Sequence, residues 1–383
     1  MALRPGPPFR PRPHEDAPSE AAVKSAIVHY WLVNRRGGEL VLDAIAELLS
    51  DADLVSHKVD PKLLVGSLAG RTVRETLIGR LPFSRTRYPA YLPLMPFALE
   101  RMDMSAYDLI VSSEAGPAKW VIKDPDAYHV CYCHSPLRYI WDQRDIYLQK
   151  IPAVLRPLAH LYASHLRHSD QLSSLRVDKF VANSAFVARR IKSYYRRDAV
   201  VIHPPVDVDT FCPSAEVGDY YVFAGELRGY KAASVAIEAC NRLKRNLRVI
   251  GGGASADLRK LAGPTIQFVG RLSDEDYRKT IAACRALLFP GVEDFGIIPV
   301  EVMASGRPVI ARGKGGALET VVHGVTGLHY TDPSPEGLSA AILQFEAEAV
   351  SFTAQACVDH ARTFGREVFM EKFAAILRDR PTD

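Results

Sequence analysis

The sequence predicts an α/β protein with two doubly wound domains that face each other across a cleft. Short apolar, β-rich runs are each followed by a turn and then by a helical pattern, which is typical of parallel α/β units. This alternation stops near Pro204-Pro205 and starts again at residue 220. The chain has 383 residues. A domain has roughly 150 residues, so the length also predicts two domains.

The N-terminal half contains the first series of runs. Residues 1–23 are rich in proline and mixed charge, lack the apolar core of a secretory signal, and predict a disordered tail. A buried strand within 25–33 ends at the turn with Gly37-Gly38-Glu39, and a helix follows. Further elements are expected at 108–113, 129–134 and 179–184 (strands) and at 185–195 (helix). Because the proline pair can continue neither a helix nor a central strand, we predict a hinge there and a first domain at 24–205.

The C-terminal half repeats the pattern and predicts a second domain at 206–362. Its strands are expected at 220–227, 247–253, 266–272, 287–291 and 308–316. Its helices are expected at 232–243, 274–286, 299–306, 317–324 and 338–348. The last segment, 363–383, has a helical pattern that we expect to pack back toward the first domain. Ligands of doubly wound sheets bind at the carboxyl ends of the strands, so the cleft is the predicted ligand site.

Composition excludes several classes of function. With 48 basic and 44 acidic residues the net charge is +4, which argues against nucleic acid as the main partner but allows an anionic substrate or lipid surface. Six scattered cysteines predict neither a disulfide framework nor a zinc site, and favour a reducing cytoplasm. No apolar run approaches the roughly 18 residues that a membrane-spanning helix needs.

The segment from Glu293 to Glu301 is the sharpest motif, and it directly follows the strand predicted at 287–291. A proline suited to the first turn of a helix places Glu301 just inside that helix and Glu293 on the loop before it. Glu293 can accept hydrogen bonds from ligand hydroxyls, and Glu301 can hold a vicinal diol such as a ribose. The backbone N–H groups of 295–298, which include Phe295 and Gly296, form a helix N-terminus that suits an anion. Either carboxylate alone is compatible with a solvated or helix-starting role; the complete segment predicts a ligand site.

These motifs resemble the retaining glycosyltransferases of family 4, which have the GT-B fold. The resemblance covers most of 25–380 and rests on Glu-x7-Glu, the following GRPVIA, and Gly315-Gly316 with Glu319. The glycine turn at 37–39 agrees with it. YCHSPLRYIWD (132–142), VANSAFVARRI (181–191) and VIHPPVD (201–207) are similar to a bacterial subgroup. That subgroup transfers mannose from GDP-mannose to a cellobiosyl-diphosphopolyprenol lipid in exopolysaccharide synthesis.

The resemblance implies roles for charged residues of the second domain. Glu293 would meet the donor-sugar hydroxyls, and Glu301 the nucleotide ribose. Lys231 would contact the diphosphate, where its ammonium offsets the charge on the leaving group. The family usually has an arginine a few residues earlier, but Glu226 stands there. Arg228 is the candidate substitute.

Further site residues come from loops around the predicted cleft. His134 ends a strand, and the resemblance implies a hydrogen bond to the donor sugar; its alternative is a structural role. Ser184 is either a donor contact or a helix N-cap. Gly37 and Gly38 either let the backbone approach the diphosphate or form a plain turn. Gly315 and Gly316 are expected to bind donor.

Residues 251–253 and Arg271 carry weaker signals. The glycines predict a tight strand-to-helix turn near the nucleotide base, since the third glycine of the dinucleotide fingerprint is missing. Arg271 would touch the base or pair on the surface.

The implied reaction is transfer with retention by front-face attack, without a metal or another cofactor. The enzyme would position the reactants and stabilise phosphate charge. We expect a cytoplasmic protein, peripheral on the inner face of the membrane, with a nucleotide sugar and a lipid-linked oligosaccharide as partners. Open alternatives are a UDP-sugar donor, a sugar-nucleotide epimerase on the same fold, and a non-catalytic sugar-nucleotide-binding protein.

Two segments bear on the membrane. Residues 151–168 carry Ile151, Leu155, Leu158, Tyr162 and Leu166 at helical spacing, with basic side chains between them. Such a helix either packs against the core or lies on an anionic membrane. The apolar, proline-rich segment 81–104 is a candidate acceptor-binding or membrane-docking loop.

Overall fold

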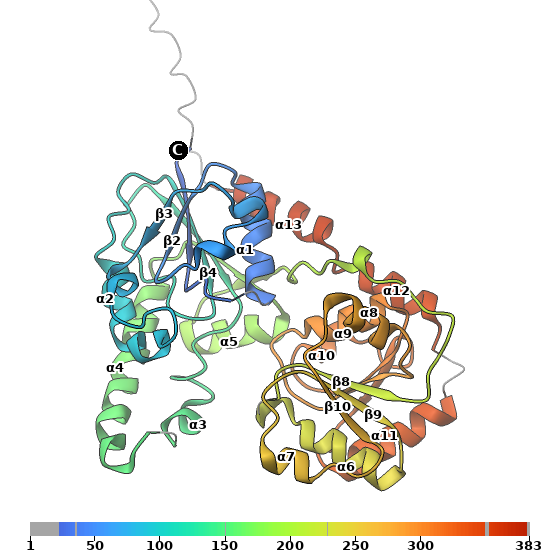
Figure 1. The fold of residues 1–383 in the computed structure, drawn as a ribbon. Coiled ribbons are helices and arrows are strands. Elements are labelled where there is room, and N and C mark those ends of the chain that lie inside the picture. The colour runs from blue at the N-terminus through green and yellow to red at the C-terminus, as the bar shows by residue number, and fades with distance from the viewer. Residues whose placement is uncertain (1–22, 35–36, 150, 228, 349–351, 381–383) are drawn as a thin grey trace, which may run out of the picture.

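The structure is a computed structural model that describes residues 23–34, 37–149, 151–227, 229–348 and 352–380. Arg228 and almost all of the predicted tail lie outside these residues. The described chain forms two lobes, each built around one sheet (Figure 1). All strand pairs of both sheets are parallel. The predicted fold class, two Rossmann-like α/β domains, is confirmed.

The first sheet has seven strands in the order β3-β2-β1-β4-β5-β6-β7. Its central strands β1 and β4 are buried along their whole length, because helices cover both faces of the sheet. The strands are β1 (Ser25–His29), β2 (Asp53–Ser56), β3 (Val73–Glu75), β4 (Leu109–Glu114), β5 (Tyr128–Cys133), β6 (Lys179–Ala182) and β7 (Ala199–Val201). Its helices are α1 (Gly37–Leu48), α2 (Met95–Glu100), α3 (Arg144–Leu148), α4 (Arg156–Ser174) and α5 (Ala185–Tyr195).

The second sheet has six strands in the order β10-β9-β8-β11-β12-β13. They are β8 (Tyr221–Ala224), β9 (Leu247–Ile250), β10 (Ile266–Gly270), β11 (Leu287–Phe289), β12 (Val309–Arg312) and β13 (Gly327–Tyr330). The helices are α6 (Ala233–Leu243), α7 (Ala256–Lys260), α8 (Asp274–Ala282), α9 (Ile297–Ala304), α10 (Ala317–Thr320), α11 (Pro335–Glu348) and α12 (Ala354–Arg362). Within the described residues, no helix combines the length and the apolar content required to cross a bilayer.

Several element boundaries differ from the sequence predictions. Strands β2, β3, β7 and β13 were not predicted, because runs of three or four residues such as DLVS and VRE are too short to show a period. The helix predicted from residue 299 starts at Ile297, since Gly296 adopts φ +97° and serves as its N-cap. The helix predicted at 274–286 ends at Ala282, and the one predicted at 317–324 ends at Thr320.

The chain crosses between the lobes twice, and the two crossings lie side by side. The backbone N–H of Val206 donates to the carbonyl of Phe364 at 3.0 Å, and Val206 also forms a parallel bridge with Gly365. After the second crossing, α13 (Arg366–Arg378) lies beside α1 of the first lobe (Figure 1). Phe369 and Phe373 of α13 are buried in the same apolar cluster as residues of β1 and α1.

We predict that Phe373→Ala destabilises the N-terminal domain by about 3–5 kcal/mol, because it empties a fully buried ring site against Tyr132 and Phe369. Urea unfolding followed by tryptophan fluorescence measures the effect. Glu371→Ala changes an exposed residue of the same helix and is the matched control. Equal effects of the two changes would contradict the docking of α13.

Candidate active site

A cavity of about 890 Å³ lies between the two domains. From the first domain it is lined at the carboxyl ends of strands, by residues that follow β1, β4, β5 and β6: Tyr30, Ala115, His134 and Asn183. From the second domain it is lined by Lys231, which follows β8, and by the loop and helix after β11. Both sheets therefore direct the ends of their central strands into one space, as expected for a doubly wound fold.

Eight of the predicted site residues line this cavity: Gly37, Gly38, His134, Lys231, Glu293, Phe295, Gly296 and Glu301. Four others lie elsewhere: Ser184, Arg271, Gly315 and Gly316 do not belong to the lining. Arg228 lies outside the described residues. Glu226, at the position where the family has arginine, is half-buried and is not part of the lining.

Lys231 and Glu293 form an ion pair at the cavity wall, with both side chains mostly buried. Gly225 is at the end of β8 with φ +136°, and a methyl group there would lie 3.6 Å from the Lys231 ammonium. The two charges offset each other. A ligand with phosphate oxygens for the lysine and hydroxyls for the carboxylate would satisfy both groups at once.

Glycines 315 and 316 hold the Glu293 loop from behind. The N–H of Gly316 donates to the carbonyl of Glu293 at 2.9 Å. A methyl group at Gly315 would fall 2.5 Å from that carbonyl oxygen, and one at Gly316 would fall 2.2 Å from the carbonyl of Phe295. The pair is therefore placed to position the loop through its backbone, a role that differs from the predicted direct donor contact.

Glu301 points into the cavity and accepts a hydrogen bond from the Tyr277 hydroxyl at 2.5 Å. Burial raises the pKa of Glu301, and the hydrogen bond from Tyr277 opposes this shift. Tyr277 orients the carboxylate and was missed by the sequence reasoning. In the sequence, the only indication of this role is the position of Tyr277 in α8, the helix that the fold places beside α9.

Two helix N-termini meet at the cavity. Gly37 begins α1, and a methyl group there would lie 2.4 Å from Cδ1 of Ile297, the first residue of α9. A methyl group at Gly38 would lie 2.5 Å from the hydroxyl oxygen of Tyr30. Both glycines thus lie close to side chains across the cavity wall, and the two helix ends direct N–H groups and partial positive charge at the same space.

His134 is neutral at physiological pH. Burial, together with the nearby His29, lowers the pKa of His134 to about 3. Its Nε2 lies 2.9 Å from the hydroxyl of Ser113, which in turn lies 3.1 Å from Nδ1 of His29. His29 Nε2 lies 3.8 Å from a carboxylate oxygen of Glu39, in the glycine turn. The imidazole can offer a hydrogen bond in the cavity but no cationic charge.

Asp294 joins the two domains beside the cavity. Its carboxylate pairs with Arg138, and accepts a hydrogen bond from Arg190 at 2.9 Å. Ser184 donates to the Asp294 carbonyl at 2.6 Å and accepts from the N–H of Val187 at 3.1 Å. Ser184 is therefore the N-cap of α5, the structural alternative considered for it, and it also contacts the second domain.

Glu319 makes a second junction. Its carboxylate accepts from the N–H groups of Ala185 and Phe186 at 2.7 and 3.0 Å, and lies 3.2 Å from His203. Burial tends to raise the pKa of Glu319, but the hydrogen bonds from His203 and the two N–H groups lower it below its ordinary value. A carboxylate of one domain thus caps a helix of the other.

Arg271 and the glycines at 251–253 lie away from the cavity lining. A methyl group at Gly251 would fall 1.9 Å from the carbonyl of Gly225, so the turn after β9 packs tightly against the turn after β8. Arg271 is exposed, and its Nε would lie 2.9 Å from a methyl group at Gly252.

Comparisons with known proteins agree with this architecture. A family model described as Glycosyltransferase Family 4 matches residues 36–210, and one described as Glycosyl transferases group 1 matches residues 213–363. The two matches together span both domains. The chain thus combines a family 4 and a group 1 glycosyltransferase domain in the GT-B fold.

Curated proteins that are similar to this chain carry names with different functions. The chain is 29% identical over 241 residues to D-inositol 3-phosphate glycosyltransferase of Mycolicibacterium paratuberculosis, covering 54% of each chain. It is 26% identical over 283 residues to human alpha-1,3/1,6-mannosyltransferase ALG2, covering 63% of this chain and 65% of that protein. The matched part thus spans between about half and two thirds of these relatives.

Solved structures share the fold. Anabaena HepE in complex with UDP superposes with a TM-score of 0.68 at 18% identity, covering 94% of this chain and 100% of that one. The apo lipopolysaccharide outer core galactosyltransferase WaaB superposes with a TM-score of 0.65 at 15% identity, covering 93% and 100%.

We predict that Asp294→Asn loosens the domain junction by about 3 kcal/mol, because it removes the negative charge that faces two arginines. Small-angle X-ray scattering should show a larger radius of gyration than for the wild type. Asp198→Asn, in an exposed pair with Lys192, is the control and should leave the radius unchanged. A wild-type radius for Asp294→Asn would refute the junction.

We also predict that stability falls as the pH drops from about 6.5 toward 4. Burial is the main cause that lowers the pKa values of His57, His129 and His134 to about 3, 4 and 3. Within this pH range the unfolded chain therefore binds protons at these histidines, whereas the folded chain does not. Each histidine removes about 1.4 kcal/mol per pH unit within this window.

The slope of unfolding free energy against pH measures this effect. His129→Asn should reduce the slope by about one proton, whatever its effect on absolute stability. An unchanged slope would contradict a buried neutral His129.

Proposed function

We propose that this protein is a retaining α-mannosyltransferase that moves mannose from GDP-mannose to a polyprenyl-diphosphate-linked oligosaccharide of the cellobiosyl type, in exopolysaccharide synthesis. The observation that carries the proposal is the convergence of Lys231, Glu293 and Glu301 on one cavity between the two domains. The motif resemblance and the similarity to ALG2, a mannosyltransferase by its printed name, support mannose as the transferred sugar.

In the proposed complex, each part of the donor contacts its own residues along the cavity. The diphosphate contacts Lys231 and the N-termini of α1 and α9. The ribose diol donates hydrogen bonds to Glu301, which Tyr277 holds in place, and the mannose hydroxyls donate to Glu293. His134, as a neutral imidazole, offers the sugar one hydrogen bond from the opposite wall.

The reaction breaks the bond between the anomeric carbon and the β-phosphate oxygen. A bond to the acceptor hydroxyl oxygen forms on the same face, and the acceptor proton moves to the departing phosphate oxygen. Lys231 and the helix ends stabilise the negative charge that develops on GDP. Retention then needs no protein nucleophile, and no metal or other cofactor takes part in the proposed step.

Because Glu293 pairs with Lys231 and Glu301 does not, we expect substitutions of these two carboxylates to have different effects. Glu301→Gln should weaken both GDP and GDP-mannose by about tenfold or more, because it loses charge-assisted hydrogen bonds to the ribose. Glu293→Gln should leave GDP affinity equal or higher, since Lys231 is released for phosphate, while it lowers mannose transfer at least tenfold.

Isothermal titration with GDP and GDP-mannose, and product mass after transfer, test these expectations. Glu275→Gln, an exposed change on α8, is the control. Equal loss of GDP binding in both variants would refute the division of roles.

The same measurements separate the alternative functions. HepE has structures with UDP and UDP-glucose by their printed titles, so UDP-glucose is the competing donor. Tighter binding of UDP-glucose than of GDP-mannose would overturn the assigned donor. Donor epimerised without acceptor would indicate an epimerase, and binding without turnover on any lipid-linked acceptor would indicate a non-catalytic protein.

A further inference from the structure

Helix α4 carries three of its four leucines on the outside. Its buried positions are small or polar apart from one leucine: Ala163, Leu166, Asp170, Ser173 and Ser174. The apolar side chains on and beside its outer face are each more than half exposed, up to 85% for Val154; they are Val154, Leu155, Leu158, Leu161, Leu172 and Leu175. We call these six residues the outer strip. A row of exposed leucines opposite the packed face is the reverse of an ordinary surface helix.

The apolar residues at helical spacing within 151–168 therefore do not share one environment in the structure. Leu166 is buried, but Leu155 and Leu158 are exposed. The core-facing alternative is wrong for these two leucines, because the turns around them project beyond the sheet (Figure 1) and no layer among the described residues covers them.

The part of the chain that carries the first four residues of the outer strip, 146–169, has basic but no acidic side chains. Arg156 and the histidines 160, 165 and 168 are exposed, and Arg167 is half-buried. Basic side chains that flank exposed leucines match the two components of an anionic membrane surface, acyl chains and negative headgroups.

A second copy of this chain fits the outer strip less well than an anionic membrane does. A symmetric contact would place Arg156 and Arg167 of one copy against the same residues of the other, without any carboxylate from 146–169 to pair with them. Like charges across such a contact oppose association.

The position of the outer strip relates it to the cavity. Helix α3 and the start of α4 extend from the N-terminal domain below its sheet (Figure 1). Gln143 and Tyr147, at the two ends of the α3 turn, line the cavity. The outer strip begins at Val154, seven positions after Tyr147, so the segment that lines the cavity leads directly into it.

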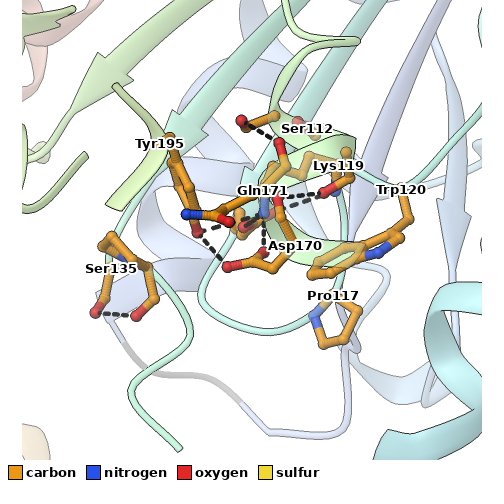
Figure 2. Close-up of polar contacts among 12 residues, drawn as sticks. Ser112, Pro117, Lys119, Trp120, Ser135, Asp170, Gln171 and Tyr195 are labelled. Carbon is orange, nitrogen blue, oxygen red and sulfur yellow. Dashed lines mark hydrogen bonds and ion pairs between the residues drawn. The ribbon is translucent and has the colours of Figure 1, made fainter. Parts of the chain in front are cut away.

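A buried ion cluster anchors α4 in the domain. Asp170 of α4 pairs with Lys119 and accepts a hydrogen bond from Tyr195 at 2.8 Å (Figure 2). It also accepts a hydrogen bond from Trp141 at 2.7 Å. Lys119 also pairs with Glu114 at the end of β4 at 2.7 Å, and the three charged side chains are fully buried. The C-terminal part of α4 is thus held in the domain by charged side chains that are shielded from water.

We propose that the outer strip of α4 docks on an anionic lipid bilayer, with its leucines among the acyl chains and its basic residues at the headgroups. The acceptor side of this inference depends on the function proposed above, but the docking itself does not. Leu158 to Leu175 spans about 25 Å at 1.5 Å per residue, so α4 lies along the membrane surface. Tyr162 donates to the carbonyl of Pro93 at 2.7 Å, which places the exposed Leu94 and Phe97 of segment 81–104 at the side of the same surface.

The test is flotation of the full-length protein with vesicles. Wild type should float with phosphatidylcholine vesicles that contain phosphatidylglycerol, and much less with phosphatidylcholine alone or at high salt. The double variant Leu158→Glu/Leu161→Glu should reduce binding by about tenfold per leucine. The control Val217→Glu/Leu343→Glu makes the same charge change at exposed apolar positions of the second domain, and should bind as wild type.

Two further readouts make the outcomes distinct. Thermal unfolding checks that the variants fold, and Leu158→Gln/Leu161→Gln replaces the double variant if they do not. Sedimentation velocity checks for self-association: a dimer that the leucine changes break, without vesicle binding by the wild type, would overturn the proposal in favour of a second copy. Unchanged flotation of the double variant would also overturn it.

Transfer assays separate this proposal from the proposed function. The double variant should keep wild-type transfer to a short-chain, water-soluble acceptor and lose it with an acceptor embedded in vesicles. A wild type that floats but transfers to neither acceptor would refute the transferase function and leave the docking surface intact. A double variant that uses the embedded acceptor like wild type would refute the docking surface.

Discussion

The contact of Asp294 with Arg138 and Arg190 is the interaction on which the site depends. Asp294 lies beside Glu293, and both arginines belong to the other domain. The cavity exists only while the domains are apposed, because each supplies part of its wall. Glu319 adds a second junction at the N-terminus of α5. Two carboxylates of one domain therefore hold the opposite domain against the loop that carries Glu293.

The charges in the cavity are arranged for a ligand with both anionic and hydroxyl groups. Lys231 and Glu293 satisfy each other in the structure, while His134 is held neutral by burial. The helix N-termini then supply positive potential without side-chain charge. Such a site favours the negative charge of a diphosphate at one end and hydrogen bonding to a sugar at the other.

Most of the fold could be predicted from the sequence, since buried parallel strands appear as apolar runs and glycine turns mark their ends. The four short strands β2, β3, β7 and β13 could not, because three or four residues do not establish a period. In the site, Glu293 and Glu301 were found through their places on the loop and helix after a predicted strand, and Lys231 through the family resemblance. Tyr277 and Asp294 were missed as site residues, since their roles come from neighbours distant in sequence.

The sequence by itself determined two α/β domains, the family motifs and the side chains available to the cavity, because periodicity and spacing are local properties of the chain. Only the tertiary structure decided that Ser184 caps α5, that Gly315 and Gly316 support a loop from behind, and that the leucines of α4 face outward. These outcomes depend on which surfaces meet. That choice is made by the packing of segments more than a hundred residues apart at the domain junction, and by the lack, in the described part of the chain, of a layer over the outer face of α4.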